Sequence, residues 1–123
     1  GNDENTHLID ETAFKKMKDG VIIVNTARGL IIDTQALIAS LKNGKVGFAA
    51  LDTFEGEVGL YYLNKETQRL DNDNMALLKS FPNVILSPHM AFYTEQAVSD
   101  MVENSIKGIL GLESGEDNRL AVK

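Results

Sequence analysis

The stretch VIIVNTARGLIID, residues 21–33, decides the fold of this chain. It opens with four β-branched residues, Val21–Val24, a pattern typical of a strand buried on both faces of a parallel sheet. Polar residues end this run, and Arg28 follows them. Asp33 is well placed to cap a helix over Thr34–Leu41. We therefore expect Arg28 in a loop between a strand and a helix, just past the carboxyl end of the strand.

The position of Arg28 favours a role in ligand binding. Open α/β sheets bind their ligands at the carboxyl ends of the strands. A guanidinium group suits such a place because its planar fork holds a carboxylate by two parallel hydrogen bonds and stays charged. The alternative is an ordinary surface arginine in a polar loop, and this stretch alone leaves both interpretations open.

The composition excludes several classes of protein. The 123 residues are 43% apolar, which is enough for the core of one small domain. The net charge of −6 and the lack of a basic face argue against nucleic acid as a partner. The absence of cysteine excludes disulfides and thiolate metal sites and is mildly favourable to a cytoplasmic location. No apolar run approaches the ~20 residues of a membrane span.

Helical and strand patterns alternate along the chain, which predicts a parallel sheet of the α/β class. The predicted helices are Glu11–Lys18, Thr34–Leu41, Met75–Ser80 and Glu95 to about Leu110, and the predicted strands are Val21–Asn25, Val46–Leu51 and Val84–Leu86. Three strands make an odd complete domain, so we expect half of a doubly wound fold. A long loop is expected from Thr53 to about Asn74, and residues 112–123 form a loose polar tail.

Each predicted strand delivers polar side chains at its carboxyl end. They are Thr26 and Arg28 after the first strand, Asp52, Glu55 and Glu57 after the second, and His89 after the third. Because these ends meet at one edge of a parallel sheet, the side chains can surround one small molecule. The only other histidine, His7, lies in the leading loop without a convergent partner, and we expect it to be solvated.

An arginine, a carboxylate and a histidine at one edge fit the interconversion of a carbonyl and a hydroxyl group. Arg28 would hold a substrate carboxylate, and His89 would give a proton to a carbonyl oxygen or take one from a hydroxyl. Glu57 would fix the tautomer of His89 and favour its charged form. A metal site built from Asp52, the two glutamates and His89 is the alternative. The permanently cationic arginine argues against a dication there, so no metal is predicted.

Several segments, taken in order, resemble the D-isomer-specific 2-hydroxyacid dehydrogenases. They are NTHLI (5–9), MKDG (17–20), VIIVNTARGLIID (21–33), residues 47–52 with Glu57, and NVILSPHMAFYTEQA (83–97). The resemblance covers residues 5 to about 110. LDTFEGE (51–57), Tyr61-Tyr62 and HMAFYTEQA (89–97) are most similar to D-lactate dehydrogenases, including the vancomycin-resistance type. Family members that act on phosphoglycerate or glycerate more often have proline at the position of Val58.

The resemblance implies an NAD-dependent interconversion of pyruvate and D-lactate. It makes Arg28 the residue that binds the substrate carboxylate, His89 the acid/base and Glu57 the partner of His89. Glu55 is the nearest rival to Glu57, and family spacing alone favours Glu57. The implied cofactor contacts are Asn5, Thr26, Ala27, Arg28 and Asp52, of which Asp52 would meet the nicotinamide carboxamide.

Family members also carry an amino-terminal substrate domain and a G-x-G-x-x-G turn that binds the pyrophosphate, and this sequence has neither. The chain therefore resembles the carboxyl-terminal third of a dehydrogenase. The resemblance implies that residues 1–111 are the second half of a Rossmann-like doubly wound fold, the carboxyl-terminal part of the NAD-binding domain, and we expect the chain to be inactive alone. The implied whole enzyme acts on a small 2-oxo or 2-hydroxy acid in the cytoplasm, as a homo-oligomer without nucleic-acid or membrane partners. The alternative is an interaction or regulatory domain that lost catalysis, against which the joint presence of Arg28, Glu57 and His89 argues.

Overall fold

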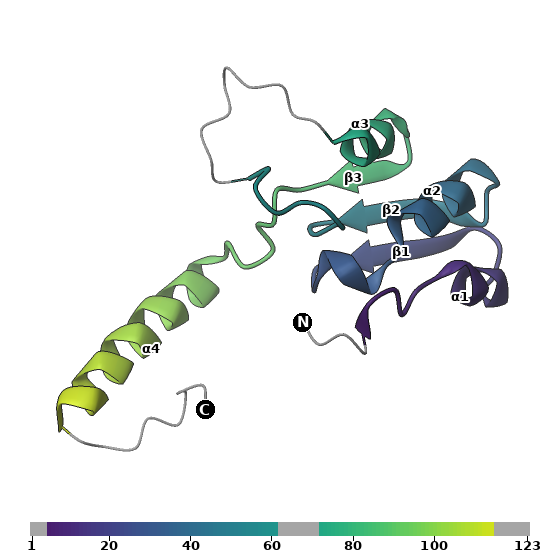
Figure 1. Cartoon of the computed structure of the whole chain (residues 1–123). Coiled ribbons are helices and arrows are strands. Elements are labelled where there is room, and N and C mark those ends of the chain that lie inside the picture. The colour runs from purple at the N-terminus through teal and green to yellow at the C-terminus, as the bar shows by residue number, and fades with distance from the viewer. Residues whose placement is uncertain (1–4, 62–71, 115–123) are drawn as a thin grey trace. The chain divides into compact units, whose positions relative to one another are not determined.

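The computed structural model describes residues 5–61 and 72–114. The chain divides into two compact units, Gly1–Met90 and Ala91–Lys123. The described elements of the first unit are α1 (Glu11–Lys16), β1 (Val21–Asn25), the 3-10 turn η2 (Gly29–Ile31), α2 (Thr34–Lys42), β2 (Val46–Leu51), α3 (Asp73–Ser80) and β3 (Val84–Leu86) (Figure 1). The second unit holds α4 (Glu95–Ser114).

The three strands form one parallel sheet in the order β1-β2-β3. In its register, Val24 lies opposite Ala50, and Ala50 lies opposite Ile85. The bounds of all three strands agree with those predicted from the sequence. Because the sheet is parallel, the three carboxyl ends lie at one edge, where the predicted polar side chains follow.

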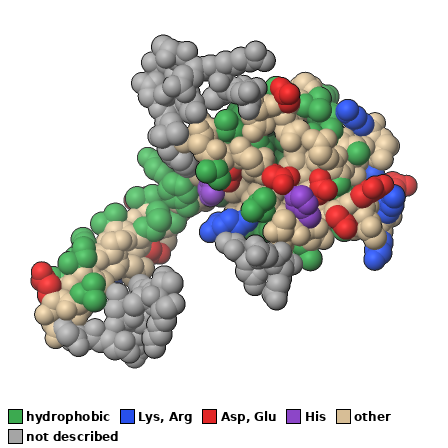
Figure 2. All heavy atoms as spheres, in the orientation of Figure 1, with side chains coloured by type: hydrophobic (Ala, Val, Ile, Leu, Met, Phe, Trp, Pro, Cys, Tyr) green, Lys and Arg blue, Asp and Glu red, His purple; other side chains and the backbone are tan. Residues whose placement is uncertain are grey.

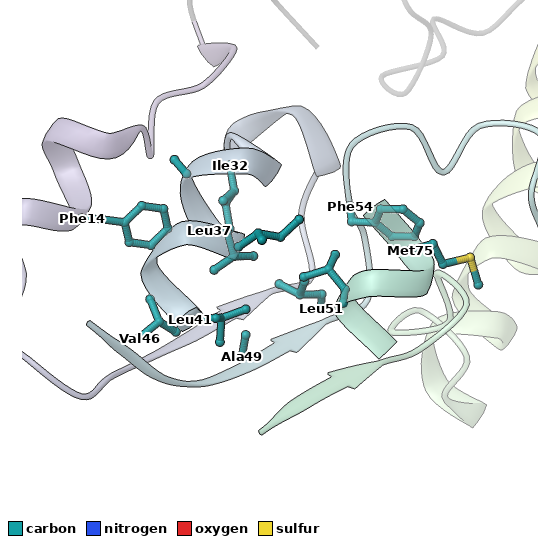
Figure 3. Packing of buried hydrophobic residues seen from close by; sticks show 12 residues of the cluster. Phe14, Ile32, Leu37, Leu41, Val46, Ala49, Leu51, Phe54 and Met75 are labelled. Carbon is teal, nitrogen blue, oxygen red and sulfur yellow. The ribbon is translucent and has the colours of Figure 1, made fainter. Parts of the chain in front are cut away.

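The hydrophobic core lies between one face of the sheet and the helices α1, α2 and α3. Its buried members include Phe14 from α1, Leu37 from α2, Val46 from β2 and Leu78 from α3. Figure 3 shows how these layers pack, with side chains of α2 and β2 facing one another and Phe14 at one end. Phe54, which follows β2, is also buried in this cluster and so anchors the start of the next loop.

The prediction that β1 is buried on both faces was wrong. Ile22 and Val24 are each 66% exposed, whereas Asn25 at the end of the strand is buried. Ile85 of β3 is also exposed. The reason is that α1, α2 and α3 contribute their buried residues to a single cluster on the other face of the sheet. A run of β-branched residues predicts a strand, but it does not tell which faces are covered.

Side-chain caps set the helix starts. As predicted, the Asp33 carboxylate accepts from the backbone N–H groups of Gln35 and Ala36 at the start of α2, and Asp10 caps α1. The cap of α3 was missed: Asn72 caps this helix, which therefore begins at Asp73 rather than at Met75. At the carboxyl ends, α1 stops at Lys16 instead of Lys18, and α2 extends one residue further to Lys42.

The second unit contains one described helix, α4. It follows Thr94, whose hydroxyl accepts from the backbone N–H of Ala97, and it runs to Ser114. The predicted end near Leu110 was too early, so Leu112–Ser114, expected in the tail, are helical; residues 115–123 lie outside the described part. An ion pair of 3.1 Å between Glu103 and Lys107, one helical turn apart, stabilises the middle of α4. Within residues 5–61 and 72–114, no helix has the length and apolar character that a membrane crossing needs.

Candidate active site

The loop that carries Arg28 is shaped by the last residue of β1. Asn25 is 6% exposed, and its amide nitrogen donates to the backbone oxygens of Arg28 (3.0 Å) and Thr53 (3.4 Å). Its side-chain oxygen accepts from the backbone N–H of Ala27 at 3.1 Å. One buried amide therefore joins the loop after β1 to the loop after β2. The sequence analysis did not assign Asn25 this role.

Arg28 lies on the surface at the predicted place. Its Nη1 donates to the backbone oxygen of Ala27 at 2.7 Å. Arg28 lines a cavity of about 300 Å³ together with Asn5 and Glu57, and the apolar part of the lining includes Leu30 and Phe54. The structure thus brings three of the predicted site residues, Asn5, Arg28 and Glu57, around one cavity.

The close approach of the two loops depends on Gly29. A Cβ atom at this position would lie 2.2 Å from the backbone carbon of Phe54 and 2.7 Å from the backbone nitrogen of Glu55. Backbone atoms cannot yield as a flexible side chain can, so only glycine fits. Gly29 therefore lets the segment with Glu55 and Glu57 lie directly against the Arg28 loop.

His89 and Glu57 form a hydrogen-bonded pair, as the sequence analysis proposed. Nδ1 of His89 lies 3.1 Å from Oε1 of Glu57. The side chain of Glu57 is 14% exposed, and that of His89 is 37% exposed. The other carboxylate oxygen of Glu57 accepts from the backbone N–H of Phe54 at 3.3 Å. The glutamate is therefore held at both oxygens, while the histidine stays accessible to a small molecule.

Asp52 braces the segment that carries His89. It is 5% exposed, and its Oδ1 accepts from the hydroxyl of Ser87 at 2.6 Å and from the backbone N–H of Met90 at 2.8 Å. Its backbone oxygen accepts from the N–H of His89 at 2.9 Å. These bonds hold His89 at φ 53°, a left-handed conformation that is uncommon outside glycine. The sequence analysis proposed Asp52 only as a cofactor contact and missed this bracing.

The expectation that His7 is solvated without a partner was wrong. Nε2 of His7 lies 2.9 Å from Oε1 of Glu55, and Nδ1 lies 4.0 Å from Oδ2 of Asp33. The two histidines therefore pair with the two glutamates, one pair each. Figure 2 shows the histidine side chains on one face, with acidic side chains beside them. Sequence position could not reveal the pairing, because Glu55 lies 48 residues from His7 along the chain.

We expect the pKa of His7 to lie above the ordinary value for a histidine. The hydrogen bond that His7 donates to Glu55 is the largest influence and raises the pKa of His7, and the charge of Asp33 adds to it. The Glu55→Gln variant should lower this pKa, and Glu57→Gln should leave it unchanged. NMR titration of the imidazole protons of His7 measures both. The pair stabilises the fold fully below the unfolded-state pKa, and this contribution disappears as the pH rises through the folded-state pKa.

The chain as a whole is similar to known proteins. A family model described as "D-isomer specific 2-hydroxyacid dehydrogenase, NAD binding domain" matches residues 1–91. The chain belongs to this family. An aromatic 2-oxoacid reductase of Clostridium sporogenes is 49% identical over 111 residues, which are 90% of this chain and 34% of the relative.

Solved structures of the family have the same fold as this chain. A D-lactate dehydrogenase from Treponema pallidum has a TM-score of 0.93 and 38% identity, over 100% of this chain and 37% of that one. The NAD-complexed form of a D-isomer specific 2-hydroxyacid dehydrogenase from Lactobacillus delbrueckii ssp. bulgaricus has a TM-score of 0.89 and 32% identity, again over 100% of this chain and 37% of that one. The chain spans about a third of the length of the relatives it matches.

As a member of this family, the chain has NAD as its cofactor. Three of the residues predicted to contact it, Thr26, Ala27 and Asp52, follow β1 and β2. Thr26 and Ala27 are exposed just past the end of β1, where their backbone can be approached, and Asp52 offers a buried carboxylate, an acceptor for amide N–H groups. Within the described ranges, no three carboxylate, histidine or cysteine side chains gather closely enough to hold a metal ion.

Proposed function

We propose that this chain is the carboxyl-terminal part of the NAD-binding domain of a D-2-hydroxyacid dehydrogenase that interconverts pyruvate and D-lactate. The observation that carries the proposal is the 3.1 Å contact between His89 and Glu57, with Glu57 lining the same cavity as Arg28. A domain that only binds a partner does not need Arg28, Glu57 and His89 together. That alternative, an interaction or regulatory domain, therefore lacks support from the site.

Arg28 binds the substrate by its carboxylate. The guanidinium fork can form two parallel hydrogen bonds with the carboxylate of a 2-oxo acid. The cavity that Arg28 lines also has the apolar residues Leu30 and Phe54 in its lining. Fixing the carboxylate at one end leaves the neighbouring carbonyl group to be oriented by a second residue.

His89 supplies the proton in the direction of reduction. The carboxylate of Glu57 accepts from Nδ1–H, so Nε2 is the ring atom through which His89 would donate to the carbonyl oxygen. After the transfer the neutral ring keeps its proton on Nδ1. In the direction of oxidation the same neutral ring takes the hydroxyl proton of D-lactate.

The residues that would hold NAD are Asn5, Thr26, Ala27, Arg28 and Asp52. NADH, when bound, supplies the hydride that reduces the carbonyl carbon, and the proton from His89 completes the hydroxyl group. The sequence contains no G-x-G-x-x-G turn for the pyrophosphate. We therefore propose that the isolated chain has no dehydrogenase activity and that the activity belongs to a full-length enzyme, which we place in the cytoplasm as a homo-oligomer.

A second candidate substrate is an aromatic 2-oxo acid. It is favoured by the 49% identity to the aromatic 2-oxoacid reductase of Clostridium sporogenes. Arg28, Glu57 and His89 would do the same chemistry on either substrate, because both carry a carboxylate next to a carbonyl group. The two candidates differ only in the side chain that the substrate pocket must accept.

The experiment is steady-state oxidation of NADH by the full-length enzyme with pyruvate and with phenylpyruvate. The hydroxy acid formed is identified by chiral chromatography. We expect D-lactate from pyruvate, and a larger kcat/KM for phenylpyruvate would select the second candidate. Absence of NADH oxidation with every 2-oxo acid, or an L-product, would contradict the proposed function.

A further inference from the structure

The second histidine–glutamate pair lies outside the reacting groups and yet contacts the same turn. Glu55 and Glu57 stand on either side of Gly56, which has φ +82°. The side chain of Glu55 reaches His7, and that of Glu57 reaches His89. The turn Glu55-Gly56-Glu57 is therefore held by a different histidine at each end.

His7 itself is fixed by its backbone. It has φ 53°, and its N–H donates to the backbone oxygen of Leu30 at 2.8 Å. Two residues later, Ile9 pairs with the segment that leads into α2, through bonds to Ile31 and from Asp33. The imidazole of His7 is thus attached to a segment outside the turn, the one that leads into α2.

Glu55 joins the turn to the amino-terminal end of α2. Its Oε1 contacts His7, and its Oε2 accepts from the backbone N–H of Thr34 at 3.5 Å. Asp33, the cap of α2, lies on the other side of the His7 ring. Without these contacts, the backbone after Glu55 could rotate at Gly56, since glycine tolerates many conformations.

We infer that His7 is a positioning residue: through Glu55 it fixes the turn that presents Glu57 to His89. The inference rests on the proposed function, in which His89 transfers the proton. His7 does not touch the substrate, so its loss should slow proton transfer without weakening substrate binding. A small displacement of an orienting group is sufficient to slow a reaction considerably.

The kinetic test uses His7→Asn in the full-length enzyme. Asparagine tolerates the left-handed backbone, but its shorter side chain cannot span the distance to Glu55. We expect a loss of about tenfold in kcat, with the KM for pyruvate within about twofold of the wild type. Glu55→Ala should lose as much kcat as His7→Asn, and the double variant with both changes should lose no more than either single variant. Glu55→Gln should keep most of the wild-type kcat, because glutamine still offers His7 a hydrogen-bond acceptor.

Asp19→Asn is the control, since it removes an exposed ion pair with Lys45 of 2.7 Å and should leave kcat unchanged. An unchanged kcat in His7→Asn, even with a lower melting temperature, would overturn the inference. NMR of the chain itself gives an independent readout. The ring nitrogen shifts of His89 should change in His7→Asn as its hydrogen bond to Glu57 loosens, and unchanged shifts would overturn the inference even if the full-length enzyme reduced no 2-oxo acid.

Discussion

The His89→Asn variant of the full-length enzyme should lose about 10² to 10⁴-fold in kcat for pyruvate reduction, the usual contribution of a general acid. Asparagine is the informative replacement because it tolerates the left-handed φ of 53° at this position. Its amide can still donate to Glu57, but it has no proton to give to a carbonyl oxygen at neutral pH. Steady-state oxidation of NADH measures the effect.

The control for His89→Asn is the analogous replacement of the other histidine. His7→Asn removes a ring from an equally left-handed backbone position, and it should cost only about tenfold in kcat. A His89→Asn enzyme that keeps a kcat within about threefold of the wild type would show that His89 is not the proton donor. The melting temperature of each variant separates loss of chemistry from loss of folding.

Arg28→Lys should reduce kcat/KM for pyruvate roughly 30- to 1,000-fold. This corresponds to a loss of about 2–4 kcal/mol of transition-state stabilisation. Lysine keeps the positive charge but loses the planar fork that holds a carboxylate by two parallel bonds. The loss should be evident when kcat/KM is measured at substrate concentrations well below KM. Arg28 is exposed and its side chain donates to the backbone oxygen of its own neighbour Ala27, so folding should be little affected.

Lys45→Arg is the matched control for Arg28→Lys. It makes the reverse exchange between the same two residue types, at a lysine that pairs with the exposed Asp19. It should leave kcat/KM unchanged. An Arg28→Lys enzyme within about twofold of the parent would remove Arg28 from the substrate site, since a tenfold change already corresponds to ~1.4 kcal/mol.

The sheet and the starts of α1, α2 and α4 could be predicted because they depend on local patterns. The strands Val46–Leu51 and Val84–Leu86 begin and end as expected, and Asp33 caps α2. Burial could not be predicted in the same way, since Ile22 and Val24 are exposed on the face of the sheet opposite the α1–α3 core. The sequence of a strand shows that its side chains are suited to burial, but the packing of other elements determines which of its faces is covered.

The pairing of the site residues needed the structure. Family spacing alone favoured Glu57 over Glu55, and an extended segment would have placed the two glutamates on the same side. The turn at Gly56 separates them, so that Glu57 contacts His89 and Glu55 contacts His7. No local pattern reveals such a separation, because it depends on contacts with segments more than 30 residues away.

The central claim is that His89 works with Glu57 as one acid/base unit. The most direct test compares kcat of the Glu57→Gln and Glu55→Gln variants of the full-length enzyme. Glutamine keeps the size of glutamate, but its neutral amide oxygen is a weaker acceptor than a carboxylate for the Nδ1–H of His89. We predict a loss of at least about tenfold for Glu57→Gln and a kcat within about threefold of the wild type for Glu55→Gln. Equal losses, or a larger loss for Glu55→Gln, would contradict the account.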